Sequence, residues 1–313
     1  MNFGSAMTLD GVLNGSVAGG VQGAITRANA DGTSDLFGGG VAKRSTNATV
    51  VTAGATGSIN ASVAPVTGAL GYAWFWGTAG NETLGAITPI NSVSITAAAA
   101  GTQLASDTNL AADNSTNALA FDGLIYQALV PGSGSYLLTM PSGQPGIGTP
   151  LTSDGAGGII EFDTALKSMW DNYRLSPGTM WVSSQEALNI SRKILAGSQT
   201  AAQRFIFESS QELVGGGVMV RTYLNRFSMQ GGSVIDIKVH PNMPAGTILM
   251  TTQALPYPLA GVGNVIQIRT RQDYYQIEWP LRTRKYEYGV YADEVLQNYF
   301  PPSLALITNI GNG

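Results

Sequence analysis

Short runs that alternate apolar and polar side chains dominate the first hundred residues of the chain. Residues 58–63 place Ile59, Ala61 and Val63 on one face, and residues 92–96 repeat the alternation. A third run, residues 49–52, is β-branched throughout. A period of two between turn-forming glycines and prolines is typical of strands, so we expect this part of the chain to be all β.

An aromatic strand follows at residues 72–76, where Tyr72, Trp74 and Trp76 share one face. Several short strands separated by turn signals fit a sandwich of immunoglobulin or fibronectin type. We therefore expect these three side chains to form the core of an immunoglobulin-like β insertion. The alternative is a platform on which sugars bind.

Helical spacing begins only in the second half. Ile159, Phe162, Leu166 and Met169 recur at steps of three or four residues, and a Ser-Pro-Gly sequence at 176–178 stops the pattern. Residues 179–182 then predict a short buried strand. Ser183 or Ser184 is expected to cap a second helix over residues 185–195, with the carboxylate at position 186 near its positive end.

Alternating runs return after the second helix and predict further strands, at residues 218–224, 234–239, 247–251, 265–270 and 274–279. The segment 285–298 reads as a strand because Tyr286, Tyr288 and Val290 alternate with polar residues. Residues 295–310 predict an apolar strand broken by two prolines. Helices flanked by many strands without regular alternation indicate an α+β fold with a mixed sheet.

Composition divides the chain near residue 150. The first 150 residues hold 24 of the 40 glycines, with 3 basic and 7 acidic residues, whereas the remainder holds 13 of each charge. Only 12% of the 313 residues are charged, against about 25% in an average soluble domain. Such a surface suits a chain that associates. No apolar run is long enough to predict a membrane span, and the net charge of −4 disfavours a free-standing nucleic-acid binder.

Candidate catalytic chemistry is sparse. The chain has no cysteine and one histidine, His240, between a predicted strand and a proline turn, where we expect its ring nitrogens to bond the turn. Glu161 and Asp163 are expected to stabilise a helix start, and Asp293 and Glu294 are too close in sequence to flank a substrate. No glycine loop has phosphate-binding spacing. The sequence predicts neither an enzyme, nor a cofactor, nor a metal site.

The densest charge cluster mixes arginines, tyrosines and carboxylates near the C-terminus. Arginine and tyrosine are enriched at protein contacts. A nucleic-acid groove is the competing interpretation, and the interspersed carboxylates weaken it. The candidates for subunit contact, of which the last four would share one face of a strand, are Arg269, Arg271, Arg282, Arg284, Tyr286 and Tyr288.

Several phrases of the second half, taken together, resemble the axial domain of tailed-phage major capsid proteins. They are Ile-Glu-Phe-Asp-Thr-Ala-Leu at 160–166, Arg-Leu-Ser-Pro at 174–177 and Met-Trp-Val-Ser-Ser-Gln-Glu-Ala at 180–187. Residues 237–248 are similar to that family's strand, Met-Pro turn and strand. Residues 293–310 look like the closing strand of its peripheral domain. Residues 69–75 are similar to immunoglobulin-like insertions of some phage structural proteins.

The resemblance, over residues 118–313, implies the shell fold shared by tailed bacteriophages and herpesviruses. It implies a subunit that self-assembles as hexamers and pentamers into an icosahedral head around double-stranded DNA, contacted at most nonspecifically. Portal, scaffold or decoration proteins are the further partners it implies. The expected location is the virion, assembled in the bacterial cytoplasm, with no membrane contact.

The expected domains are a glycine-rich segment at 1–45, the β insertion at 46–100, a linker at 101–117 and the capsid-like region at 118–313. The family has an N-terminal arm, an extended loop and a long spine helix ahead of its axial domain, and residues 1–117 predict no long helix. Either the chain is a C-terminal piece or these elements are replaced. The alternative function is a β-rich tail or adhesion module that binds surface glycans through Trp74 and Trp76; an enzyme that depends on His240 is a third.

Overall fold

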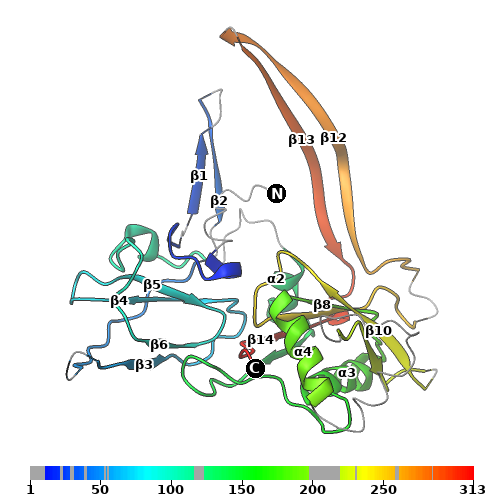
Figure 1. Cartoon of the computed structure of the whole chain (residues 1–313). Helices are drawn as coiled ribbons and strands as arrows, with labels where there is room; N and C mark the ends of the chain where they lie inside the picture. Colours follow the sequence, from blue (N-terminus) through cyan, green and yellow to red (C-terminus); the bar gives the residue numbers. More distant parts are fainter. Residues whose placement is uncertain are drawn as a thin grey trace, which may run out of the picture.

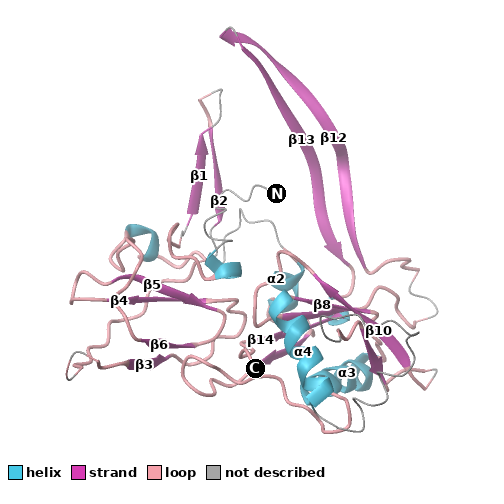
Figure 2. Ribbon diagram, viewed as in Figure 1, coloured by secondary structure: helices cyan, strands magenta, loops and turns pink. Residues whose placement is uncertain are grey.

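The protein is a mixed α/β structure with few helices and several separate sheets (Figures 1 and 2). The computed structural model describes residues 11–21, 24–28, 32–38, 41–52, 54, 56–115, 123–196, 219–229, 231–257, 261–283 and 285–313. Two bodies lie side by side, a β-rich part from the first half of the chain and a helix-covered sheet from the second (Figure 1). The change in composition near residue 150 falls close to the boundary between them.

The second body is built on a mixed six-stranded sheet with the order β7-β14-β11-β8-β10-β9. The strand pairs β7 with β14 and β8 with β10 are parallel, and the other neighbours are antiparallel. All five residues of β14 are buried, so the end of the chain completes the core. The strands are β7 (Tyr136–Thr139), β8 (Thr179–Val182), β9 (Thr222–Asn225), β10 (Ser233–Val239), β11 (Ile248–Thr251) and β14 (Leu304–Thr308).

Helices α3 (Ile160–Tyr173) and α4 (Ser184–Ala196) cover one face of this sheet. Phe162 and Leu166 of α3 and Ile190 of α4 are fully buried there. Ser183 caps α4, because its Oγ accepts a hydrogen bond from the Glu186 N–H at 3.2 Å. Both predicted helices and the strand between them are thus confirmed.

The opposite face of the sheet is covered over β7, β14 and β11 by the short helix α2 (Leu124–Leu129). Ala128 of α2 packs with Leu249, Leu304 and Leu306, which all point to this side. The 3-10 turn η2 (Pro301–Ser303) holds the two prolines and leads into β14, so the predicted break of the run 295–310 at these prolines is confirmed.

The β-rich part contains three antiparallel strand pairs (Figure 2). The pairs are β1 (Ala24–Ala28) with β2 (Ser34–Gly38), β3 (Ile59–Ser62) with β6 (Ser92–Ile95), and β4 (Tyr72–Trp76) with β5 (Thr83–Thr88). The predicted strands around residues 59, 74 and 93 are confirmed. An immunoglobulin sandwich has about seven strands, and its likeness to these described pairs stays a prediction.

Residues 49–52 form no strand, contrary to the prediction from their β-branched side chains. Val50 is 63% and Val51 90% exposed, and no described segment pairs with this run. Strand preference reflects packing on neighbouring strands more than the backbone itself, and no described strand lies beside this run. These residues favour a strand, but no described strand forms a hydrogen-bonded ladder with them.

The described part of the expected linker, residues 101–115, packs on the β-rich part. Gly101 donates its N–H to the Leu84 carbonyl at 2.8 Å, and the Leu84 N–H donates to Gln103 at 2.9 Å. The 3-10 turn η1 (Thr108–Leu110) buries Leu110, which packs near Leu84 and Ile87. These bonds bind the segment to β5 in the manner of an added strand.

The β-rich part and the sheet are joined by hydrogen bonds around the turn that enters β6. Ser92 Oγ accepts from the Gly146 N–H at 2.9 Å, and Asn91 Nδ2 donates to Ser142 Oγ at 2.7 Å. Gly246 approaches Pro89 so closely that an added Cβ would lie 3.2 Å from the proline Cβ. The two bodies therefore share a packed seam.

Candidate assembly surface

The last long element of the chain is a free-standing β-hairpin. Strands β12 (Ile266–Thr283) and β13 (Lys285–Asn298) pair only with each other and project away from the body (Figure 1). The alternation that predicted strands at 265–270, 274–279 and 285–298 is confirmed, but two of those runs form a single strand. Three register shifts interrupt the ladder and bend the ribbon.

The base of the hairpin is bonded firmly to the body. Tyr299 donates its N–H to Val265, and Val265 donates to Gln253, both at 3.0 Å. The Gln127 side chain from α2 donates to the Leu296 carbonyl at 3.3 Å. The direction in which the hairpin leaves the body is therefore fixed at its root.

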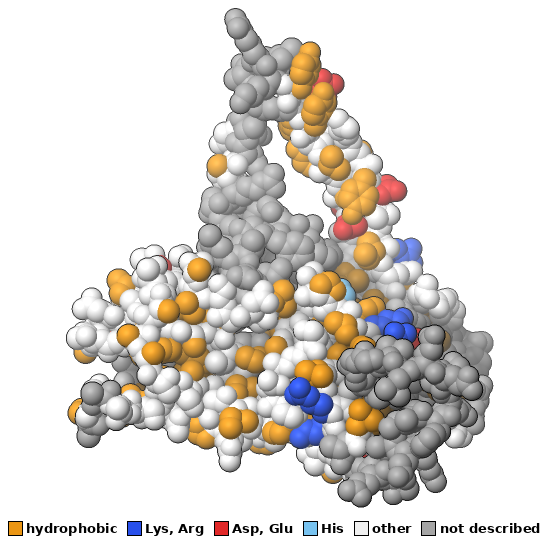
Figure 3. All heavy atoms as spheres, viewed as in Figure 1, with side chains coloured by type: hydrophobic (Ala, Val, Ile, Leu, Met, Phe, Trp, Pro, Cys, Tyr) orange, Lys and Arg blue, Asp and Glu red, His pale blue; other side chains and the backbone are white. Residues whose placement is uncertain are grey.

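Large apolar side chains are exposed along the hairpin, and Figure 3 shows several of them on the face that it draws. Large exposed apolar patches are uncommon on monomeric proteins, and an isolated two-stranded hairpin is marginally stable in water. The side chains exposed by between 57% and 71% are Ile268, Tyr274, Tyr286, Tyr288, Val290 and Val295.

The outer half of the hairpin is organised by an aromatic stack. The rings of Tyr275 and Tyr291 lie 5.7 Å apart at an interplanar angle of 30°. The Tyr291 ring also covers Gly289, where an added Cβ would lie 2.7 Å from the tyrosine oxygen. A side chain at 289 would therefore displace the Tyr291 ring.

The predicted contact residues are spread along the hairpin and do not form one patch. Arg269 and Arg271 lie in the half near the body: Arg269 donates to the Tyr299 hydroxyl, and Arg271 forms a salt bridge with Asp293 at 2.5 Å. The Arg271 side chain is still 87% exposed. Both guanidinium groups thus have partners within the chain.

Tyr286 and Tyr288 lie in the outer half of β13, where both side chains are exposed. Arg282 lies in β12, but its side chain is outside the described part of the structure, and Arg284 is outside it altogether. The expectation that Arg282 and Arg284 share a face with the tyrosines stays a prediction.

The outer edges of β12 and β13 have no neighbouring strand among the described residues. Every second residue on such an edge points its N–H and C=O outward, which makes it a template for another chain. The sequence alternation could not reveal this, because a strand reads the same whether one or both of its edges are paired.

The aromatic strand β4 uses its polar atoms inside its own domain. Trp74 Nε1 donates to Thr88 Oγ1 at 2.7 Å, and Trp76 Nε1 donates to the Ala97 carbonyl at 3.0 Å. The Tyr72 hydroxyl accepts from the Val66 N–H at 3.0 Å. All three side chains are half-buried, whereas the fully or nearly fully buried core of this part consists of Val21, Leu84, Ile87 and Leu110. Both indole N–H groups are therefore engaged within the domain, and the Tyr72 hydroxyl accepts one hydrogen bond there.

His240 is exposed at the end of β10, where its Nδ1 accepts a hydrogen bond from the Asn242 N–H at 3.2 Å. Its ring meets Trp181 edge-on at 5.9 Å. The ring therefore bonds the turn, as expected. Within the described ranges, no group of three or more His, Asp or Glu side chains could hold a metal ion, and no helix is long and apolar enough to cross a membrane.

Glu186 is a buried carboxylate whose environment the sequence did not predict. It is 0% exposed in the first turn of α4, and burial raises its pKa to about 7. Hydrogen bonds from Gln185, Asn189 and the backbone of Gly246 oppose the shift without cancelling it. The burial of Glu186 could have been predicted from its spacing, because position 186 shares a helix face with the buried Ile190.

Comparison with known proteins gives no family for the chain. No protein-family model matches it, and no curated protein matches it. Among solved structures it is similar to the holo-SrpI encapsulin complex from Synechococcus elongatus PCC 7942, with 16% identity over 60% of this chain and 56% of that chain, at a TM-score of 0.29.

The chain is also similar to a phage-related protein from Bordetella bronchiseptica RB50. The identity is 14% over 49% of each chain, at a TM-score of 0.27. The chain spans about half the length of each of these two proteins. Its structural neighbours thus include an encapsulin and a phage-related protein, both at low scores.

Proposed function

We propose that this chain is a structural subunit that assembles with copies of itself into a closed shell, of the kind formed by tailed-phage major capsid proteins. In this proposal the shell is an icosahedral phage head around double-stranded DNA, and the protein has no catalytic cycle. Its location would be the virion. The β-rich part would be an immunoglobulin-like insertion on the shell.

The observation that carries the proposal is the β12–β13 hairpin. Its exposed aromatic and aliphatic side chains and its two unpaired edges are costly to leave in water. A neighbouring chain that covers the hairpin removes both costs. The anchored base supports a docking arm of fixed direction in preference to a loose tail.

A second copy of the chain is the partner favoured by symmetry and composition. An arm that reaches from one copy onto a different surface of the next makes a head-to-tail contact, which closes into rings when the rotation allows. Copies can cover each other on several sides, which makes a charged fraction of 12% tolerable. With a net charge of −4, contact with DNA would be nonspecific and secondary.

The test is the mass distribution of the purified protein, measured by mass photometry across protein concentration and salt. The variant Tyr288→Glu with Val290→Glu places two charges on the exposed face of β13. Val66→Glu is the matched control, since Val66 is also exposed but lies in the β-rich part. We expect large particles for the wild type and the control, and subunits for the hairpin variant with an unchanged melting temperature. Equal assembly of all three proteins would contradict the role of the hairpin.

A further inference from the structure

A second unpaired edge lies on the six-stranded sheet, at β7. This strand pairs only with β14, in parallel register. Met140 donates its N–H to the Thr308 carbonyl, so the even-numbered residues beside it bond inward. By strand alternation, the N–H and C=O groups of Leu137 and Thr139 point outward. No described strand pairs with this side of β7.

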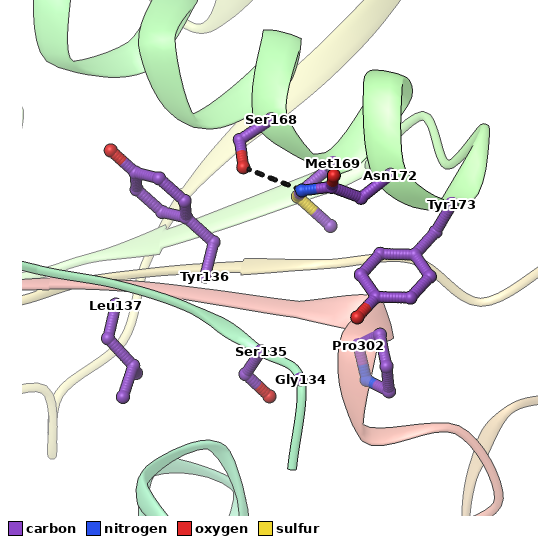
Figure 4. A pocket seen from close by; sticks show the side chains of 9 residues that line it. All are labelled: Gly134, Ser135, Tyr136, Leu137, Ser168, Met169, Asn172, Tyr173 and Pro302. Atoms are coloured by element: carbon purple, nitrogen blue, oxygen red, sulfur yellow. Dashed lines mark hydrogen bonds between the residues drawn. The ribbon is translucent and has the colours of Figure 1, made fainter. Parts of the chain in front are cut away.

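A pocket of about 150 Å³ opens between the start of β7 and the C-terminal half of α3 (Figure 4). Tyr136 points its ring toward the helix, and Met169 and Tyr173 contribute apolar groups to a lining whose accessible surface is mostly polar. Ser168 and Asn172, joined by a hydrogen bond of 3.3 Å, add polar groups from α3. An extended segment along the β7 edge would therefore lie beside the pocket and could place a side chain in it.

The start of β7 is closely packed at one end of the pocket. Gly134 has a φ of +74°, and an added Cβ there would lie 2.8 Å from the Tyr173 hydroxyl. Ser135 Oγ donates to the Pro301 carbonyl at 2.7 Å, which ties the start of β7 to η2. A cavity of about 150 Å³ admits a ligand the size of benzene, so it has room for the end of a valine side chain.

The chain itself contains a segment that fits this edge. Residues 49–52, Thr-Val-Val-Thr, are β-branched, no described strand pairs with them, and Val51 is 90% exposed. The preceding Asn47 is held by a hydrogen bond to Glu82 at 2.7 Å, so the run leaves the β-rich part from a fixed point. No charged residue lies between Arg44 and Glu82, and burying the segment would desolvate no charge.

We infer that residues 49–52 of one copy add as an extra strand to the β7 edge of a second copy, with one of the two valines in the pocket beside α3. The backbone groups of Leu137 and Thr139 supply the ladder, and the pocket sets the register. The inference rests on the proposed self-assembly and names one contact within it. In the single chain the segment is solvent-exposed, and no described strand pairs with the outer side of β7.

The first test uses a fluorescent peptide of residues 45–56 and measures its anisotropy with the full-length protein. We expect saturable binding, weakened about tenfold or more when both valines of the peptide are replaced by aspartate. Ser168→Trp, which fills the pocket, should abolish binding, as should Thr139→Pro, which removes an outward N–H. Thr139→Ala is the matched control and should bind normally. Circular dichroism and melting temperature verify that each variant is folded.

The second test uses the absence of cysteine in the chain. Val51→Cys protein is mixed with Asn172→Cys protein under mild oxidation, and a covalent dimer is expected on a denaturing gel. Val66→Cys with Asn172→Cys is the control pair and should stay monomeric on the gel. Equal binding of the native and aspartate peptides, or no excess of the specific dimer over the control, would overturn the inference. If shells form but this contact is absent, the inference is overturned and the proposed function stands. If the contact forms but no shells are seen, the proposed function is contradicted and the inference stands.

Discussion

Asn91 and Asn309, 218 residues apart, hydrogen-bond to each other twice. The Asn91 N–H donates to Asn309 Oδ1 at 2.8 Å, and Asn309 Nδ2 donates to Asn91 Oδ1 at 3.0 Å. Asn309 Nδ2 also donates to the Met140 carbonyl at 2.6 Å. Both asparagines are buried, so this pair ties the β-rich part to the end of β14 across the seam.

Replacement of Asn309 should destabilise the whole protein. Its φ of 62° lies in the left-handed region that asparagine tolerates better than alanine. Asn309→Ala loses the bonds, leaves buried polar groups unpaired and strains the backbone, for a total of roughly 2–4 kcal/mol. Asn309→Gly should cost less, because it relieves the strain. Urea denaturation measures both, and equal stability of the wild type and the alanine variant would refute the seam.

Glu186 should make the stability of the protein fall as the pH rises. Its pKa is about 7 in the folded protein and 4.5 as the ordinary value, so between these values the folded state holds a proton that the unfolded state has lost. The stabilisation is complete below pH 4.5 and is lost as the pH rises through about 7, with a total change of roughly 3 kcal/mol.

The measurement for Glu186 is the free energy of unfolding from pH 4 to 8, for the wild type and Glu186→Gln. Glutamine has nearly the same shape and no titrating proton, so the difference between the two curves isolates this one group. We expect the difference to change across the window set by the two pKa values. Parallel curves would show that Glu186 does not titrate there.

Gly289→Ala should impair assembly more than folding. The added methyl group would meet the Tyr291 ring and displace it from its stack with Tyr275. Gly289 lies in β13, which projects away from the body and its buried core (Figure 1), so the melting temperature should change little, while the protein concentration needed for assembly should rise. Light scattering against concentration checks this, and an unchanged assembly threshold would contradict the ordering role of the stack.

Trp76→Ala should lower the stability of the folded protein, and it should abolish no glycan-binding signal. The Trp76 ring packs on Gly85, and its indole N–H is bonded to Ala97, so the side chain acts within its own domain. A glycan array with the wild type, Trp74→Ala and Trp76→Ala distinguishes the two functions. A wild-type signal abolished by both substitutions, with both proteins still folded, would favour the adhesion module over the shell subunit.

Local patterns predicted the elements well where one face is buried. The spacing of Phe162, Leu166 and Met169 predicted α3, because a helix that covers a sheet needs such a stripe. Strand preference alone was not sufficient at residues 49–52, where no described strand pairs with the run. The capsid-like architecture and the self-contacts expected from residues 118–313 remain proposals.

The sequence patterns could not predict contacts between residues that lie far apart in the sequence. Nothing local in Asn91 or Asn309 indicates that they meet, and an alternating run does not tell whether its edges are paired. The candidate contact residues were placed on strands as expected, but the free-standing hairpin that carries them came only from the structure. The burial of Glu186 was missed because a carboxylate in a first helical turn is usually solvated.

Shell assembly through the hairpin is tested most directly by cryo-electron microscopy of the purified protein under assembling conditions. We expect closed shells in which the β12–β13 hairpin lies against a neighbouring copy and Tyr288 is buried in that contact. A protein that stays monomeric at every concentration and salt, or a shell in which the hairpin remains in solvent, would contradict this expectation.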